Sequence, residues 1–194
     1  MTGYIKLRKK ALDKLHTNLP DKLYYHGVHH TLKALNICGL YIKASNIDKY
    51  QAKLLRIGIL FHDIGFTVSN KEHEEKSAEI ASEMMSELGF SGKDINIVTG
   101  LIKSTRVPQT PKTILEKIIC DVDLDYLGRS DFYPVSNMLY KELKAHSAMM
   151  NKNDWNKIQI KFLEQHRYHT DFALKKRQPE KEKRIAELKA IVKN

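Results

Sequence analysis

A histidine and an aspartate, His62 and Asp63, stand side by side at the end of an apolar run over residues 54–61, and Gly65 follows them. A carboxylate among hydrophobic side chains is costly to bury unless it is paired or holds a metal. Imidazole and carboxylate ligands together suit divalent ions such as zinc, iron and manganese. The pair could also be structural, with Asp63 ending a helix and His62 packing beside it, and a two-residue motif alone favours that simpler interpretation.

Three more histidines, His26, His29 and His30, occur within five residues just before another apolar stretch. If a helix begins near His26, then His26 and His30 are four residues apart and share one face. His29 is turned by about 100° from His30 on such a helix. Because an apolar helix follows directly, the placement of these histidines favours a site over an accidental surface cluster.

His73 is a further candidate, near the start of a helix expected over residues 71–88 with Gly89 as its C-cap. It shares a row with Ser77 and with the predicted core stripe of that helix, which is Ile80, Ala81, Met84 and Leu88. We expect His73 either to be a hydrogen-bonded structural residue or to take part in the site, directly or through another ligand.

Three aspartates, Asp121, Asp123 and Asp125, alternate with other residues in a helix expected over residues 113–126. On a helical wheel, Asp123 lies about 70° from the centre of the apolar stripe, and Asp121 lies about 130° away on the other side. Asp123 is therefore the predicted inward carboxylate. Asp121, which is predicted to point more toward solvent, is the fallback, and the whole pattern could also be an ordinary acidic helix edge.

The elements that carry these candidates show apolar residues at helical spacing, and no segment alternates for long enough to predict a strand. Helix start signals are Ser91, Thr113 with Glu116 as a capping box, and Asp154. The predicted fold is all-α, with eight or nine helices. Their expected ranges are about 4–15, 26–41, 51–62, 71–88, 91–106, 113–126, 131–150, 154–163 and from 179 onward.

Length and composition predict one globular domain over residues 1–194. Hydrophobic residues make up 42% of the 194, which is typical of a chain with a substantial core. The two cysteines, Cys38 and Cys120, are too few for a disulfide framework and favour a reducing, cytoplasmic compartment. The sequence shows neither a signal-peptide pattern nor an apolar run long enough to cross a membrane, and the oligomeric state stays open.

The net charge of +10 indicates an anionic partner. Much of the excess lies near the two ends, in residues 6–10 and 175–193, where charge runs are usually solvated helix faces. No aromatic residues interleave these runs as they do in nucleic-acid platforms, so we do not expect direct nucleic-acid binding. An anionic small molecule is the expected partner.

A histidine, a His-Asp pair and a distant aspartate, in this order, resemble the HD superfamily of metal-dependent phosphohydrolases. The matching stretches are residues 25–31, 61–65 and 120–124, and the resemblance covers roughly residues 20–130. It implies a compact helical bundle in which residues 131–194 form C-terminal helices of the same domain. It also implies one or two divalent metals, with manganese, iron, cobalt, zinc and magnesium all possible. The implied ligands are His30, His62, Asp63 and Asp123, with Asp121 as the fallback and His73 for a second metal.

The spacing of His26 and His30 also resembles the histidine segment of cyclic-nucleotide phosphodiesterases, in which the first histidine is a general acid. Gly27 replaces the asparagine of that segment, so the likeness to this branch is partial. It implies that His26, as an imidazolium, protonates the leaving oxygen. Asp63 is the second predicted catalytic residue, because it can bridge two metals or orient the nucleophile.

The predicted function is hydrolysis of a phosphomonoester or phosphodiester, with a nucleotide as the expected substrate, by attack of a metal-activated hydroxide. Lys103, Arg106 and Arg129 border the site segments and could hold substrate phosphate, although each could equally be a surface charge. Two alternatives stay open. One is a catalytically silent module that senses a nucleotide or a metal, and the other is a basic helical protein that binds nucleic acid.

Overall fold

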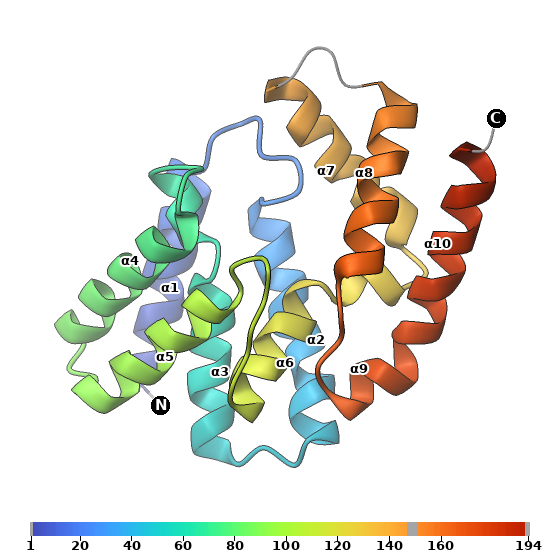
Figure 1. Ribbon diagram of the computed structural model, residues 1–194. Coiled ribbons are helices and arrows are strands. Elements are labelled where there is room, and N and C mark those ends of the chain that lie inside the picture. Colours follow the sequence, from blue (N-terminus) through green and yellow to red (C-terminus); the bar gives the residue numbers. More distant parts are fainter. Residues whose placement is uncertain (1, 147–150, 193–194) are drawn as a thin grey trace.

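The computed structural model describes residues 2–146 and 151–192, and every regular element in this part of the chain is a helix (Figure 1). The predicted all-α fold is therefore confirmed. The elements are α1 (Thr2–Asn18), α2 (Val28–Ala44), α3 (Lys49–Phe61), the 3-10 helix η1 (Ile64–Thr67), α4 (His73–Glu87), α5 (Gly92–Ser104), α6 (Ile114–Asp123), the 3-10 helix η2 (Asp125–Gly128), α7 (Phe132–His146), α8 (Lys152–Gln165), α9 (Asp171–Lys176) and α10 (Gln178–Val192).

Helix α3 lies at the centre of the bundle because it is apolar on nearly every side. From Leu54 to Phe61 every residue except Arg56 is buried. A helix that is hydrophobic all round is stable only when neighbours cover it, and here α1, α2, α5 and α6 pack against it (Figure 1). Gly58 allows α5 and α6 to come close, since a Cβ there would lie 3.1 Å from Leu101 Cβ.

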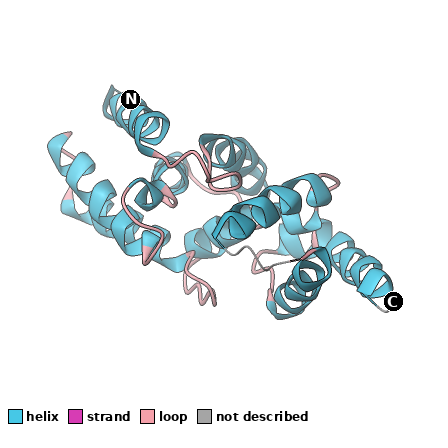
Figure 2. Cartoon of the chain, turned by 90° about the horizontal axis from the view of Figure 1, so that it is seen from above, coloured by secondary structure: helices cyan, strands magenta, loops and turns pink. Residues whose placement is uncertain are grey.

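Two hydrophobic clusters share α3. The first packs α1, α4 and α5 against α3, with Leu7, Ala81 and Val98 among its buried side chains. The second joins α2, α6, α8 and η2, with Ile37, Ile119 and Leu163 in its core. The chain ends of these two groups, in α1 and α10, lie on opposite sides of the molecule (Figure 2). The end of α3 therefore lies between two packed groups of helices, where their side chains can meet.

The turn after α3 brings the start of α4 against the His-Asp pair. Gly65 in η1 approaches α4 so closely that a Cβ there would overlap the His73 carbonyl oxygen. The Gly65 N–H also donates a hydrogen bond to the Ser77 hydroxyl at 2.8 Å. The glycine after the His-Asp pair is therefore a packing requirement that places His73 next to Asp63.

Buried aspartates tie the C-terminal segment to α6 and η2. Asp121 accepts hydrogen bonds from the backbone N–H groups of His169 and Thr170, both at 2.8 Å, and from the Thr170 hydroxyl at 2.6 Å. Asp125 pairs with Arg177 at 2.7 Å. The wheel prediction that Asp121 points toward solvent was wrong, because residues 169 and 170 cover that face of α6.

Several element boundaries also differ from the predictions. Helix α2 begins at Val28 rather than near His26, and the helix expected to reach Tyr126 ends at Asp123, where η2 takes over. The described residues contain ten α-helices rather than eight or nine, because the six-residue α9 is separate from α10 and is too short to show a periodic pattern. The buried row of α4 is shifted from the predicted stripe and consists of Glu74, Ser77, Ala78, Ala81 and Met85.

The predicted helix starts are confirmed in two cases of three. Ser91 caps α5, and Thr113 forms the capping box with Glu116 at the start of α6. The prediction for Asp154 was wrong, because Asn151 caps α8 and accepts a hydrogen bond from the Asp154 N–H at 2.9 Å. Asn and Asp are both favoured N-caps, so residue type alone does not choose between them. The end of the helix expected over 131–150 falls on residues 147–150, which lie outside the described residues.

No helix in the described part of the chain has both the length and the apolar character that a membrane crossing needs. The single-domain organisation of residues 1–194 stays a prediction. The packing of α10 against α8, α9 and η2 connects the end of the chain to the elements that follow α6.

Replacing Asp121 with alanine should lower the free energy of unfolding by about 2–4 kcal/mol, because three donors on His169 and Thr170 lose their acceptor. Urea denaturation followed by circular dichroism measures this. The matched control is Asp13→Ala in α1, where the aspartate is exposed and the change should stay within about 0.5 kcal/mol. Equal midpoints for the two variants would contradict the structural role of Asp121.

Candidate metal centre

Side chains from three separated segments converge at one point in the core. His30 Nε2 lies 3.1 Å from His62 Nε2 and 3.2 Å from Asp123 Oδ1. Asp63 Oδ2 lies 3.3 Å from His62 Nε2 and 3.5 Å from His30 Nε2. Donor atoms that share one ion at about 2.0–2.2 Å lie roughly 3 Å from one another. The spacing of the donor atoms is therefore that of a metal site.

The end of a helix positions each of these side chains. His30 is in the first turn of α2, and Asp123 is the last residue of α6. His62 is the C-cap of α3, with Asp63 directly after it. The Nδ1 atom of His62 donates a hydrogen bond to the Ile59 carbonyl oxygen at 2.8 Å. This bond fixes the ring so that Nε2, as a lone-pair donor, faces the other ligands.

The cluster holds more lone pairs than its own protons can satisfy. Asp63 Oδ2 is buried and has no hydrogen-bond partner among the described residues, and an unpaired buried carboxylate oxygen is costly. Burial lowers the pKa of His62, but the carboxylates of Asp63 and Asp123 outweigh burial and raise this pKa to about 10. The site therefore attracts positive charge, and its set of imidazoles and carboxylates fits a divalent cation.

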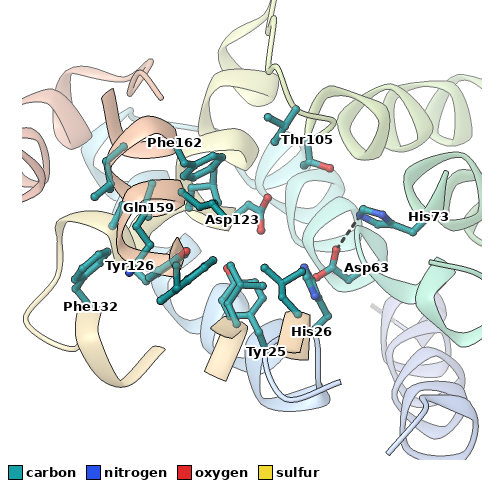
Figure 3. A pocket seen from close by; sticks show the side chains of 18 of the residues that line it. Tyr25, His26, Asp63, His73, Thr105, Asp123, Tyr126, Phe132, Gln159 and Phe162 are labelled. Carbon is teal, nitrogen blue, oxygen red and sulfur yellow. Dashed lines mark ion pairs between the residues drawn. The ribbon is translucent and has the colours of Figure 1, made fainter. Parts of the chain in front are cut away.

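His73 faces the Asp63 carboxylate, and a dashed line marks this ion pair in Figure 3. Its Nε2 atom is 3.6 Å from Asp63 Oδ1, whereas Oδ2 faces His30 and His62. Burial lowers the pKa of His73, so the ring is neutral near pH 7 and can offer a lone pair. The two oxygens of Asp63 thus face different imidazoles, as they would if the carboxylate bridged two ions.

His26 stands at the edge of the same site, where Glu142 of α7 holds it. Glu142 Oε1 accepts a hydrogen bond from His26 Nδ1 at 2.5 Å, and Oε2 accepts the backbone N–H groups of Tyr25 and His26 at 2.8 and 3.1 Å. The His26 ring also stacks on Phe66, with centroids 4.3 Å apart. Burial lowers the pKa of His26, but the Glu142 hydrogen bond and nearby carboxylates outweigh burial and raise it. His26 can therefore carry a proton near neutral pH.

Glu142 is a site residue that the sequence analysis missed. The carboxylate is only 4% exposed, although it belongs to a helix that was identified by its apolar stripe. Glu142 follows Met138 by four residues and Leu139 by three, so it lies on that same stripe. A carboxylate on the apolar face of a helix was the signal that could have identified it.

The three predicted phosphate-binding cations all pair with carboxylates, and of the three only Arg129 lines a pocket together with His30 and Asp123. Lys103 pairs with Glu75 at 2.7 Å, and Arg106 lies near the carboxylates of Glu72 and Glu75. Arg129 forms two hydrogen bonds with Asp131, at 2.7 and 2.6 Å. Their contact with substrate stays a prediction. Asp121, the fallback ligand, directs its carboxylate to residues 169 and 170 instead.

A cavity of about 280 Å³ opens beside the cluster (Figure 3). Asp63, His73 and His26 lie at one end of it, and Tyr126 and Phe132 lie at the other. A substrate in this cavity would reach both the candidate metal ligands and the His26 imidazole.

A family model, the HD domain, matches residues 27–125, which is just over half of the chain. The chain belongs to the HD domain family. Members of this family bind divalent metals, and most of them are hydrolases. The HD domain match begins just before α2 and ends just after α6, so it contains His30, His62, Asp63 and Asp123. Comparisons with curated proteins and with solved structures give no match.

Replacing Glu142 with glutamine should lower the pKa of His26, because the amide removes the negative charge that favours the imidazolium. A pH titration of the histidine ring protons by NMR measures this pKa directly. Glu164→Gln, an exposed site on α8, is the control and should leave the pKa of His26 unchanged. An unchanged pKa in the Glu142 variant would show that this carboxylate does not control His26.

Proposed function

We propose that this HD domain protein is a metal-dependent phosphohydrolase that cleaves a phosphomonoester or phosphodiester of a nucleotide. The observation that supports it most is the convergence of His30, His62 and Asp123, with donor atoms within 4.8 Å of one another, beside a cavity. A structural His-Asp pair would be satisfied by its neighbours. Asp63 Oδ2 accepts no hydrogen bond from the described residues, although the Nε2 atoms of His62 and His30 lie 3.3 and 3.5 Å away, and this favours a ligand set over such a pair.

His30, His62, Asp63 and Asp123 would hold a divalent ion. When bound, such an ion supplies Lewis acidity, which lowers the pKa of water and offsets charge on a phosphoryl oxygen. The protein's own contribution is orientation. The Ile59 carbonyl fixes the His62 ring, and the packing of Gly65 against α4 places Asp63 between His62 and His73.

His26 is the proposed general acid. In the imidazolium form Glu142 holds the Nδ1 proton of His26, so the Nε2 proton is the one that can be transferred to the leaving ester oxygen. The breaking P–O bond then releases an alcohol rather than an alkoxide. Glu142 keeps the imidazolium form available near neutral pH and fixes the direction of the ring, which is the role of a positioning residue.

Replacing His62 or Asp63 with alanine should abolish bound metal and phosphoester turnover together, because each change removes a donor atom from the cluster. Elemental analysis after chelation and metal add-back, coupled to assays on nucleotides, cyclic nucleotides and an aryl phosphodiester, measures both. Circular dichroism should show largely unchanged helix content. The matched control is His29→Ala, because His29 is exposed beside His30, and this variant should retain metal and activity.

Two results would contradict the proposal. Full activity in either alanine variant would show that the cluster is not the catalytic site. Retained metal in the wild-type protein, with no turnover of any phosphoester, would instead leave a catalytically silent metal-binding module.

Replacing His73 with alanine should remove only a second ion, because His73 faces the Asp63 oxygen opposite to His30 and His62. If the wild-type protein binds two ions per chain, the variant should bind one with little change in affinity. Isothermal titration with manganese counts the sites. An unchanged stoichiometry of two would exclude His73 as a ligand.

A further inference from the structure

The cavity beside the metal cluster has two chemically different ends (Figure 3). The polar end contains His26, Asp63, His73 and Asp123. Phe132 lies at the other end, and much of the remaining lining is apolar, from Leu124, Leu127, Leu139, Leu143, Trp155, Ile158, Phe162 and Leu163. All but two of these nine side chains belong to α7 and α8, outside the part of the chain that the HD domain match covers. The apolar lining is therefore built mainly by helices outside the matched segment.

No lysine or arginine occurs among the described residues that line this cavity, although the chain contains 33 of them. The charged side chains there include the carboxylates of Asp63, Glu74 and Asp123. An additional phosphate group in the cavity would lose its hydration without gaining a cationic partner, which is costly. The charge distribution therefore suits one phosphoryl group at the metal cluster and an uncharged group beyond it.

Two hydrogen-bond donors at this cavity lack partners among the described residues. They are the Tyr25 hydroxyl and the Trp155 indole N–H, on side chains that are 4% and 3% exposed. The Tyr25 hydroxyl points into the cavity (Figure 3). The Gln159 amide is already used, because its oxygen accepts from Ser136 and its nitrogen donates to Asn156. The Tyr25 hydroxyl is thus an unpaired donor at the cavity, which a ligand with an acceptor atom would satisfy.

We infer that the apolar end binds the uncharged ring of a substrate that carries a single phosphoryl group, and that this ring is aromatic and bears a hydrogen-bond acceptor. Aromatic side chains surround the space, among them Tyr25, Tyr126 and Phe162, and such rings favour stacked or edge contacts with a flat ligand. Nucleoside monophosphates and aryl phosphates belong to this class. The inference rests on the proposed function, because that function places the phosphoryl group at the metal cluster.

Trp155 makes the inference directly measurable, because it is the only tryptophan of the chain and lines the cavity. Phenylphosphonate and methylphosphonate, which cannot be hydrolysed at the P–C bond, are titrated into the protein while tryptophan fluorescence is recorded. We expect phenylphosphonate to change the fluorescence and to bind at least about tenfold more tightly than methylphosphonate. Equal affinities would overturn the inference.

Ile158→Gln tests whether the apolar end is responsible for this preference. Ile158 lines the cavity but is 46% exposed, so a polar residue of similar length should not unfold the protein. The phenyl-to-methyl affinity ratio should fall at least about threefold. Ile191→Gln on α10, where the isoleucine is 57% exposed and away from the cavity, is the control and should keep the ratio. A ratio that survives in the Ile158 variant would place the ring elsewhere.

The inference that the substrate carries only one phosphoryl group is tested by comparing the binding of adenosine monophosphate and adenosine triphosphate in the presence of excess metal. The monophosphate should bind at least about tenfold more tightly, and equal or tighter binding of the triphosphate would overturn this part. None of these titrations requires turnover. Selective binding of phenylphosphonate without hydrolysis of any ester would therefore contradict the proposed function while supporting the ring subsite.

Discussion

The structure is organised around a small group of imidazoles and carboxylates whose negative charge must be balanced by a bound proton or cation. The Nε2 atoms of His30 and His62 lie 3.1 Å apart, and Asp63 and Asp123 each place a carboxylate oxygen 3.2–3.5 Å from both imidazoles. Such a group is stable only if a proton or a cation balances it. The carboxylates of Asp63 and Asp123 raise the pKa of His62 for the same reason, because they favour a positive charge on the ring. A divalent ion meets this demand with the ligand types that such ions prefer.

The fold meets this constraint by placing helix ends, rather than helix middles, at the centre. The start of α2, the end of α3 and the end of α6 each deliver one part of the ligand set. The apolar surface of α3 holds these ends together from both sides, through two hydrophobic clusters. The C-terminal helices, which lie outside the segment that the HD domain match covers, contribute further side chains to the site. Glu142 of α7 holds His26, and α7 and α8 form the apolar end of the cavity.

Much of this arrangement could be predicted from local patterns. Helical periodicity identified the all-α fold, and the wheel position of Asp123 favoured it over Asp121, whose carboxylate indeed lies elsewhere. The burial of Asp121 could not be predicted in this way, since it depends on residues 169 and 170, which are distant in sequence. The same holds for Glu142 and His26, which are 116 residues apart. Lys103 and Arg106 illustrate the opposite case. Closeness in sequence to the site did not predict that Glu75 would engage both side chains.

The central claim is that the four ligand side chains hold a divalent ion. Anomalous X-ray diffraction, recorded at the absorption edge of the metal that copurifies with the protein, tests this claim most directly. We predict an anomalous peak about 2.0–2.2 Å from His30 Nε2, His62 Nε2, Asp63 Oδ2 and Asp123 Oδ1. A metal-loaded crystal with its anomalous peak at another place, and with these four side chains hydrogen-bonded only to one another or to water, would contradict the account.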